Sequence, residues 1–384
     1  MLLNRLPSLG LRGLPTSISS SRLFSSASVL LRPVQLLKPT ELHSLLTEGD
    51  KGKDVVVLDA SWFMPGAQKE DGTPRDGWKE YRKRRVEGSG YWHLDQISSP
   101  SPSPAPTAPG HDIPSKELFE DACSRLGISR ESHVVLYDTH PGGFFSAPRG
   151  AFTFSHFSHP HISILSGGLS AWESAGLPVS TTGPRNPNPH DVESMSGLKG
   201  RYQPIFSELL YSSRPRVESY FIADIEELFT SYKVPEGAER AGEVKQWEEM
   251  NANIEKGGEG FAVLDARPEG RFHGTTPEPR PNLPSGHMPY SHSLPSSAVL
   301  HPETKELLPP AELEKVFEQA LGKEGWEKVK RGERGVVNSC GSGMTAAILW
   351  LALQRCGVSD NVGLYDESWT GYASRKESKI VKTE

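Results

Sequence analysis

One of the three cysteines, Cys340, lies where a thiol could act as a nucleophile. It follows the apolar segment 335–339 and opens the sequence Cys-Gly-Ser-Gly-Met-Thr, after which residues 346–355 are strong helix formers. We therefore expect a strand-to-helix turn at the carboxyl end of a parallel strand, where open α/β sheets place their sites. The backbone N–H groups of such a turn and the amino end of the helix stabilise a thiolate, which is the nucleophilic form of cysteine.

The five residues after this cysteine would shape its surroundings. Gly341 and Gly343 let the backbone curl so that successive N–H groups point inward. The hydroxyl of Ser342 could hydrogen-bond the sulfur and relay a proton, or it could only structure the loop. Met344 and Thr345 are expected to line the substrate-binding site together with Gly341 and Gly343, and Thr345 also to cap the helix or brace the loop.

The other thiols and a histidine cluster are not expected to carry chemistry. Cys123 and Cys356 each lie near the end of a helical pattern, as buried and inert cysteines do. The cysteines are scattered without the spacing of zinc ligands, so we expect no metal and no cofactor. His156, His159 and His161 are close in sequence and are interpreted as a solvated loop cluster.

The chain contains an internal repeat. The segment 55–61 (Val-Val-Val-Leu-Asp-Ala-Ser) matches 261–267 (Phe-Ala-Val-Leu-Asp-Ala-Arg), and 134–138 matches 336–340, in the same order and at nearly the same offset. Each matched segment is a short Val- and Leu-rich run ending in polar residues, as buried parallel strands are. Helical patterns such as 115–126 and 310–321 lie between them. This alternation predicts the α/β class, with two domains that each hold a parallel sheet covered by helices on both faces.

Length and composition agree with two domains and two connectors. The 384 residues are enough for two or three domains. Residues 98–109 alternate Ser and Pro, which indicates an extended surface insertion, and residues 180–203 are polar and rich in Gly, Pro, Asn and Ser. The expected organisation is a leader 1–34, a first domain 35–182, a linker 183–215, a second domain 216–376 and a tail 377–384.

Charge and hydropathy exclude two classes of partner. The formal net charge is -6 at pH 7, which argues against direct binding of nucleic acid. No run of about 18 apolar residues occurs, so no membrane span is expected. Up to Thr40 the chain has five basic residues, no acidic residue and many serines. This pattern is typical of a mitochondrial transit peptide and predicts location in the matrix. The alternative is a disordered basic tail that has no targeting function.

Besides the Cys-Gly-Ser-Gly-x-Thr-Ala loop at 340–346, four further segments carry a family resemblance, namely 365–369, 58–62, 146–149 and 165–169. Together these segments resemble the tandem rhodanese-type sulfurtransferases, and among them the branch that uses 3-mercaptopyruvate. The resemblance covers nearly everything after residue 38, and the cysteine loop is its most specific part. The resemblance implies two rhodanese-like domains, the first inert and the second catalytic, with the site between them. Asp138 stands where the second domain has its cysteine, in agreement with an inert first domain.

The resemblance also implies a substrate and a reaction. Thiosulfate-using members carry basic residues after the cysteine, whereas Gly341 and Ser342 are neutral, as suits a thiol donor with one carboxylate. Arg271 and Arg280 match the arginines that bind this carboxylate and the neighbouring ketone, although either could instead form a surface salt bridge. The implied reaction transfers sulfur from 3-mercaptopyruvate to Cys340 as a persulfide, releases pyruvate, and passes the sulfur to cyanide or to a thiol such as thioredoxin or glutathione.

Other functions remain open or are disfavoured. A thiosulfate:cyanide sulfurtransferase, or a persulfide carrier for tRNA thiolation, would use the same cysteine. A phosphatase on this fold needs an arginine six positions after the cysteine, where this chain has Ala346. A rhodanese module used only for binding would normally lack the nucleophile.

One expected residue is missing from its usual place. Several relatives carry a histidine in the first domain that is credited with proton relay, and the aligned segment here is 85–89, Arg-Val-Glu-Gly-Ser. No Ser-His-Asp relay is therefore assigned. The second domain keeps His287 in the corresponding segment, and we interpret it as structural.

Overall fold

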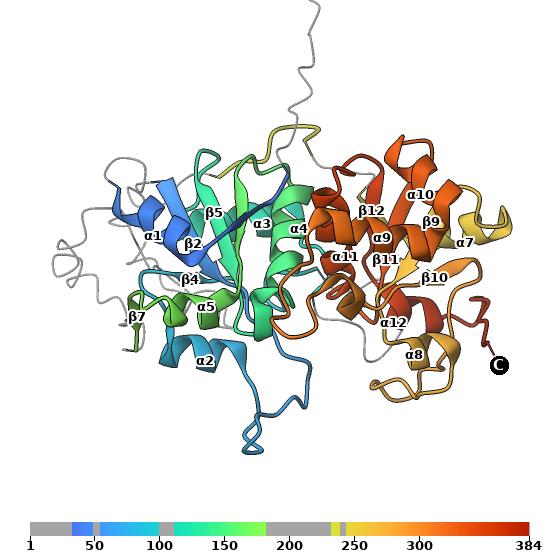
Figure 1. Cartoon of the computed structure of the whole chain (residues 1–384), viewed down its shortest axis with the longest axis horizontal. Coiled ribbons are helices and arrows are strands. Elements are labelled where there is room, and N and C mark those ends of the chain that lie inside the picture. Colours follow the sequence, from blue (N-terminus) through green and yellow to red (C-terminus); the bar gives the residue numbers. More distant parts are fainter. Residues whose placement is uncertain (1–32, 49–53, 100–110, 182–231, 239–242, 384) are drawn as a thin grey trace, which may run out of the picture. The chain divides into compact units, whose positions relative to one another are not determined.

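Figure 1 shows the computed structural model, which describes residues 33–48, 54–99, 111–181, 232–238 and 243–383. All of them belong to one compact unit, Leu31–Glu384. The expected leader (except for residues 33 and 34), the linker 183–215 and most of the Ser/Pro insertion lie outside the described residues. We call residues 33–181 the first half and residues 243–383 the second half.

The first half is built on a five-stranded parallel sheet with the order β1-β6-β5-β2-β4. The strands are β1 (Gln35–Leu37), β2 (Val55–Asp59), β4 (Gly90–Tyr91), β5 (His133–Tyr137) and β6 (Ile162–Leu165). The helices are α1 (Pro39–Thr47), α2 (Gly77–Lys83), α3 (Lys116–Arg125), α4 (Ala147–His156) and α5 (Gly168–Ser174). A small antiparallel pair, β3 (Arg85–Val86) with β7 (Val179–Ser180), and a 3-10 turn, η2 (Pro141–Gly143), complete it.

The second half has a second five-stranded parallel sheet, with the order β10-β9-β11-β12-β8. Its strands are β8 (Val244–Lys245), β9 (Phe261–Asp265), β10 (Ser291–Ser293), β11 (Gly335–Ser339) and β12 (Val362–Tyr365). Its helices are α7 (Trp247–Glu255), α8 (Glu269–His273), α9 (Pro310–Leu321), α10 (Lys323–Lys330), α11 (Ala346–Arg355) and α12 (Ser368–Ala373), with the 3-10 turn η4 (Ser296–Val299).

The two sheets have the same topology, which confirms the repeat. Read in the opposite direction, the second order becomes β8-β12-β11-β9-β10, so that β2 corresponds to β9 and β5 to β11. The segments matched in the sequence are therefore the neighbouring central strands of each sheet. The helical patterns 115–126 and 310–321 are also confirmed, as α3 and α9. Ser115 caps α3, because its Oγ accepts a hydrogen bond from the N–H of Leu118 at 3.2 Å.

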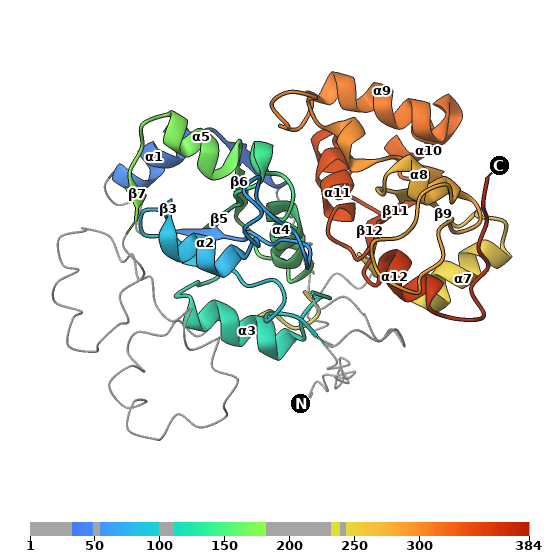
Figure 2. The same cartoon turned by 90° about the horizontal axis from the view of Figure 1, so that it is seen from below.

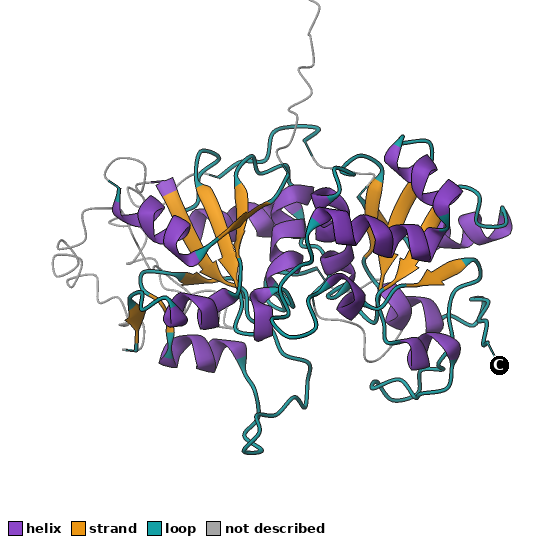
Figure 3. Ribbon diagram, viewed as in Figure 1, coloured by secondary structure: helices purple, strands orange, loops and turns teal. Residues whose placement is uncertain are grey.

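Both faces of each sheet are buried, which explains why the strands read as continuous apolar runs. In β5, Val134 and Leu136 pack in the core that contains α3 and α4, whereas Val135 and Tyr137 pack in the core with α1 and α5. Figure 2 shows α3 and α5 on opposite sides of this sheet, and Figure 3 shows the strands between layers of helices. The predicted fold, a parallel sheet with helices on both faces in each domain, is thus confirmed.

The apolar core continues from one half into the other. All residues of α11 from Ala346 to Gln354 are buried. The ring of Trp350 in this helix meets Phe152 of α4 edge to face, with 5.2 Å between the ring centres. Because α11 starts directly after the cysteine loop, this packing ties the loop to both halves.

Two contacts cross the expected domain boundaries. Tyr232, which we assigned to the second domain, packs against Phe119 of the first half and hydrogen-bonds His159. In the expected tail, Val381 pairs through its backbone with His287 of the second half. The sequence near these residues does not predict either contact, because each contact joins segments that are far apart in the chain.

Asp59, at the end of β2, is expected to make stability depend on pH. It is fully buried, and this burial raises its pKa to about 7 despite hydrogen bonds from Ser61. An unfolded aspartate has a pKa of about 3.9. The folded protein therefore holds the proton more tightly, and this contribution to stability, up to about 4 kcal/mol, is lost as the pH rises from about 4 through 7.

Asp59→Asn should accordingly raise the melting temperature at pH 8, and by more than it does at pH 5. The matched control is Asp265→Asn, at the equivalent position of the second half, where the carboxylate pairs with Arg267. That variant should be destabilised at both pH values. Thermal unfolding followed by circular dichroism at the two pH values checks this, and a gain for Asp59→Asn that is equal at both would contradict it.

Candidate active site

Cys340 lies in the strand-to-helix turn that the sequence predicts. It directly follows β11 and precedes α11, which begins at Ala346 as expected. Its side chain is buried, with 2% of its surface exposed. The thiol is therefore held at the carboxyl end of a central strand, away from bulk water.

A single hydroxyl group fixes the two ends of the loop that follows Cys340. Ser368 Oγ accepts hydrogen bonds from the N–H of Cys340 at 3.1 Å and from the N–H of Gly343 at 3.0 Å, and donates to the carbonyl of Tyr365 at 2.8 Å. Ser368 is buried and has a φ of 50°, a left-handed conformation that is unusual for serine. The sequence motif contained this serine, but its role could not be read there.

The middle of the loop keeps its backbone donors available. Within the described part of the chain, the N–H groups of Gly341, Ser342, Met344 and Thr345 make no hydrogen bond. Such a set of amides next to a helix N-terminus is suited to binding an anion. The loop can therefore receive the charge of a thiolate or a persulfide.

The equivalent loop of the first half contains its own anion. Asp138 follows β5 as Cys340 follows β11. Its Oδ2 accepts hydrogen bonds from the N–H groups of Phe145, Ser146 and Ala147 at 2.7–3.0 Å, and its Oδ1 accepts from His140. The carboxylate thus fills the cradle and leaves no nucleophile, as the sequence predicts.

Two arginines flank the residue after the cysteine. A Cβ atom added to Gly341 would lie 3.1 Å from Nη2 of Arg271 and 3.6 Å from Nη1 of Arg280. An alanine here would have to displace the Arg271 guanidinium by a few tenths of an ångström, whereas its contact with Arg280 would be of ordinary length. At Gly343, with a φ of 79°, a Cβ atom would lie 2.8 Å from the carbonyl oxygen of Asp366.

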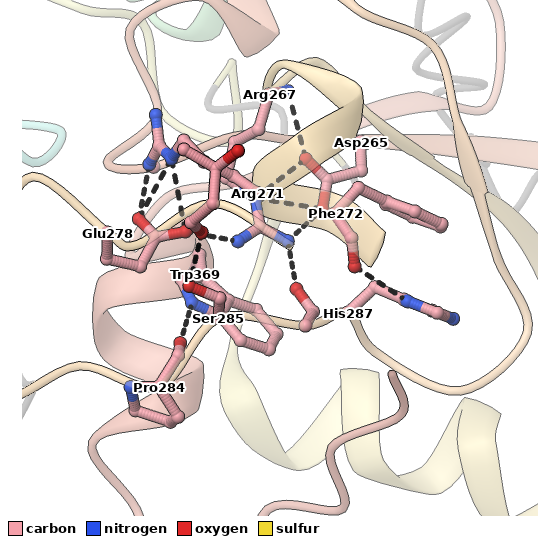
Figure 4. A network of polar contacts seen from close by, with 12 residues as sticks. Asp265, Arg267, Arg271, Phe272, Glu278, Pro284, Ser285, His287 and Trp369 are labelled. Carbon is pink, nitrogen blue, oxygen red and sulfur yellow. Dashed lines mark hydrogen bonds and ion pairs between the residues drawn. The ribbon is translucent and has the colours of Figure 1, made fainter. Parts of the chain in front are cut away.

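The two arginines differ in their partners. Arg271 donates from Nε and Nη2 to the carboxylate of Glu278, which also accepts from Arg267 (Figure 4). Arg280 makes none of the described hydrogen bonds or ion pairs, and burial lowers its pKa while the charge of Cys340 opposes this. Both guanidinium groups lie beside the cysteine loop. Of the two, Arg271 is paired with a carboxylate, and Arg280 has no described hydrogen-bond or ion-pair partner.

A histidine that the sequence reading missed contacts Ser342. His111 Nε2 lies 2.6 Å from the carbonyl oxygen of Ser342 and 3.1 Å from its Oγ. On the other side of the ring, Nδ1 lies 3.4 Å from Oδ1 of Asp95, and Trp62 donates from its indole to that same oxygen at 2.8 Å. A serine, a histidine and a carboxylate thus lie next to one another, although the sequence alone led us to assign no such relay.

This histidine lies outside the segment in which relatives carry theirs. That segment begins at Arg85 in β3 and contains no histidine. His111 comes instead at the end of the Ser/Pro insertion, directly before the capped start of α3. The sequence His-Asp-Ile-Pro before a helix cap was the available signal.

A buried ion pair clamps the two halves around the loop. Arg149 of α4 is fully buried and donates to Asp366 Oδ1 at 2.5 Å, to the carbonyl of His111 at 2.8 Å and to that of Gly343 at 3.4 Å. The other oxygen of Asp366 accepts from the N–H of Ile113 at 2.7 Å. One pair of side chains therefore positions both the histidine segment and the cysteine loop.

The structure also places the remaining predicted residues. Met344 is buried, and Thr345 occupies the position before α11, but the side chain of Thr345 makes no capping hydrogen bond. His287 donates from Nδ1 to the carbonyl of Phe272 at 2.9 Å and stacks on its ring, as a structural residue would.

The two other cysteines lie in unreactive surroundings. Burial raises the pKa of Cys123 well above its ordinary range and that of Cys356 to about 12. Among the described residues, no group of three or more His, Cys, Asp or Glu side chains could hold a metal ion. The described helices also include none that is long and apolar enough to cross a membrane.

Comparison with known proteins identifies related sequences and structures. The model of the rhodanese-like domain matches residues 246–375. The probable 3-mercaptopyruvate sulfurtransferase of Schizosaccharomyces pombe is 30% identical over 336 residues, which cover 87% of this chain and 92% of the relative. The human 3-mercaptopyruvate sulfurtransferase is 30% identical over 334 residues, covering 87% and 90%.

The structural comparison agrees with this relationship. The crystal structure of the Tum1 protein from Saccharomyces cerevisiae superimposes with a TM-score of 0.67 at 26% identity, covering 92% of this chain and 99% of that chain. The similarity thus extends over both halves. The chain therefore belongs to the family of 3-mercaptopyruvate sulfurtransferases, which are sulfurtransferase enzymes built on the tandem rhodanese fold.

Proposed function

We propose that this enzyme takes sulfur from 3-mercaptopyruvate and carries it as a persulfide of Cys340 to a thiol or to cyanide. The observation that carries the proposal is the position of Arg271 and Arg280 beside Gly341, directly after the nucleophile. Two guanidinium groups suit a ligand with a carboxylate and an adjacent ketone. The loop itself adds no further cation, in agreement with a donor that has a single carboxylate.

The reaction proceeds in two half-reactions. The thiolate of Cys340 attacks the sulfur of the donor, the carbon–sulfur bond breaks, and its electron pair remains on the carbon fragment as the enolate of pyruvate. Protonation of the enolate gives pyruvate, and Cys340 holds the persulfide. An acceptor thiolate or cyanide then attacks the outer sulfur, and the thiolate of Cys340 is restored. The free amides of the loop support the persulfide anion, in the way that the amides of the first half bind the Asp138 carboxylate.

The proton of the donor thiol needs a path to the enolate. Ser342 Oγ and the ring of His111 lie on such a path, because the hydroxyl is 3.1 Å from Nε2. At rest Nε2 donates its hydrogen to the carbonyl oxygen of Ser342, at 2.6 Å, so this hydrogen bond must break before Nε2 can take a proton from the hydroxyl. Asp95, at 3.4 Å from Nδ1, would stabilise the imidazolium that forms when the ring takes the proton. The hydroxyl of Ser342 accordingly relays a proton in this mechanism.

His111→Gln tests the relay. It should lower kcat with 3-mercaptopyruvate by about a hundredfold or more, because general acid–base catalysis is lost. Thiosulfate has no thiol proton, so its half-reaction is the internal control and should fall much less. Steady-state kinetics with both donors checks this. Equal losses with the two donors would mean that His111 only holds the loop.

A donor competition with the purified enzyme tests the proposed function. Pyruvate release from 3-mercaptopyruvate is compared with thiocyanate formation from thiosulfate and cyanide. We expect kcat/KM to favour 3-mercaptopyruvate at least about tenfold, since one uncompensated arginine suits one carboxylate. A preference for thiosulfate would contradict 3-mercaptopyruvate as the donor and favour a second candidate function, that of a thiosulfate sulfurtransferase. The relative TUM1 from Saccharomyces cerevisiae, which is 30% identical over 326 residues, has that name.

The acceptor and the location are proposed on less direct grounds. We infer a thiol acceptor such as thioredoxin or glutathione, and location in the mitochondrial matrix. The basic, serine-rich first forty residues support this location. So does a relative from Arabidopsis thaliana named as mitochondrial, which is 29% identical over 344 residues. Cell fractionation tests the location, and a cytosolic majority would contradict it.

A further inference from the structure

The net positive charge beside the cysteine loop is smaller than that of its two arginines, because the carboxylate of Glu278 offsets part of it. Glu278 is buried, with 2% of its side chain exposed, and faces Arg267 and Arg271 at once (Figure 4). Arg267 is already neutralised by Asp265, to which it donates three hydrogen bonds. The negative charge of Glu278 therefore falls mainly on Arg271.

Glu278 binds the nitrogen of Arg271 that approaches the cysteine loop. The nitrogen nearest to Gly341 is Nη2, and this nitrogen donates to Glu278. Arg280, whose Nη1 also approaches Gly341, has no carboxylate partner among the described ion pairs. The two guanidinium groups and the one carboxylate leave a single net positive charge beside the nucleophile.

We propose that Glu278 sets donor selectivity, because its carboxylate limits the site to one net positive charge and so disfavours dianionic donors. This inference rests on the proposed function. 3-Mercaptopyruvate has one carboxylate and is matched by this charge. Thiosulfate has two negative charges, one of which would be left uncompensated beside the buried Cys340, where unpaired charge is costly.

The experiment measures kcat/KM for the two donors in charge-altered variants. Glu278→Gln keeps the shape and removes the charge, and should raise the ratio of thiosulfate to 3-mercaptopyruvate by about tenfold or more. Glu278→Asp is the matched control, because it keeps the charge and shortens the side chain. It should leave the ratio near that of the wild type even where both rates fall.

The opposite change gives the opposite result. Arg271→Gln leaves the charge of Glu278 in place and should lower the ratio below that of the wild type, which also tests the inference if Glu278→Gln does not fold. Equal losses with both donors in Glu278→Gln would show that this residue only positions Arg271, and would overturn the inference. The ratio of the wild type alone tests the proposed function, so the two failures are distinguishable.

Discussion

Replacement of Cys340 by serine is expected to lower kcat/KM at least about a thousandfold with every sulfur donor. A hydroxyl cannot form a persulfide, and the loop amides and the arginines then have no sulfur to stabilise. No other cysteine can take over, because burial raises the pKa of Cys123 well above its ordinary range and that of Cys356 to about 12. Those thiols stay protonated at neutral pH.

The matched controls are Cys123→Ser and Cys356→Ser, which remove the two other thiols one at a time. Both should keep the activity if they fold. Mass spectrometry after exposure to donor should find one added sulfur atom in the wild type and in both controls, but none in Cys340→Ser. Iodoacetamide should inactivate the enzyme by labelling Cys340 first, and bound donor should slow this. Activity that survives in Cys340→Ser would mean that the site is elsewhere.

Arg149→Met is expected to lower the free energy of unfolding by about 3–5 kcal/mol, because it leaves a buried carboxylate at Asp366 without its partner. The variant also loses the hydrogen bonds to the carbonyls of His111 and Gly343. Activity should therefore fall as well. The cysteine loop and the histidine segment are no longer held by a common residue.

Urea unfolding of three variants separates these effects. The double variant Arg149→Met/Asp366→Leu should recover much of the stability, because a buried pair replaced by apolar side chains costs less than a broken pair. Its activity should stay low, since the loop and the segment at Ile113 still lack their polar contacts. If the free energy of unfolding of Arg149→Met falls by less than about 1 kcal/mol, the Arg149–Asp366 ion pair does not hold the two halves together as we expect.

The parts of the fold that were predicted correctly have local causes. The strand 335–339 and the helix 346–355 follow from apolar patterning and helix propensity, and their junction places Cys340 without any knowledge of distant contacts. Residues that act through tertiary contacts were not found in this way. His111 reaches Ser342 across 231 positions of sequence, and nothing near either residue indicates the other.

The roles of three further residues were not predicted correctly, because each role depends on hydrogen bonds that the sequence does not show. Ser368 could be quoted as part of a motif, but its role depends on two amides 25 and 28 positions away. Arg271 was predicted as a ligand for the substrate, whereas its bond to Glu278 changes the charge that it offers. Thr345 looked like a helix cap by type and position, yet its hydroxyl makes no such bond.

The two loops of the repeat differ in whether their anion is permanent. In the first half, Asp138 satisfies the amides once, during folding, and Gly168 takes the left-handed conformation there with a φ of 57°. At the corresponding position the second half has Ser368, in the same conformation at the cost expected for a non-glycine residue. The strained conformation of Ser368 therefore costs some folding free energy, but it organises the catalytic loop without a built-in anion. The loop of the first half cannot turn over a substrate, because the Asp138 carboxylate that binds its amides is part of the chain.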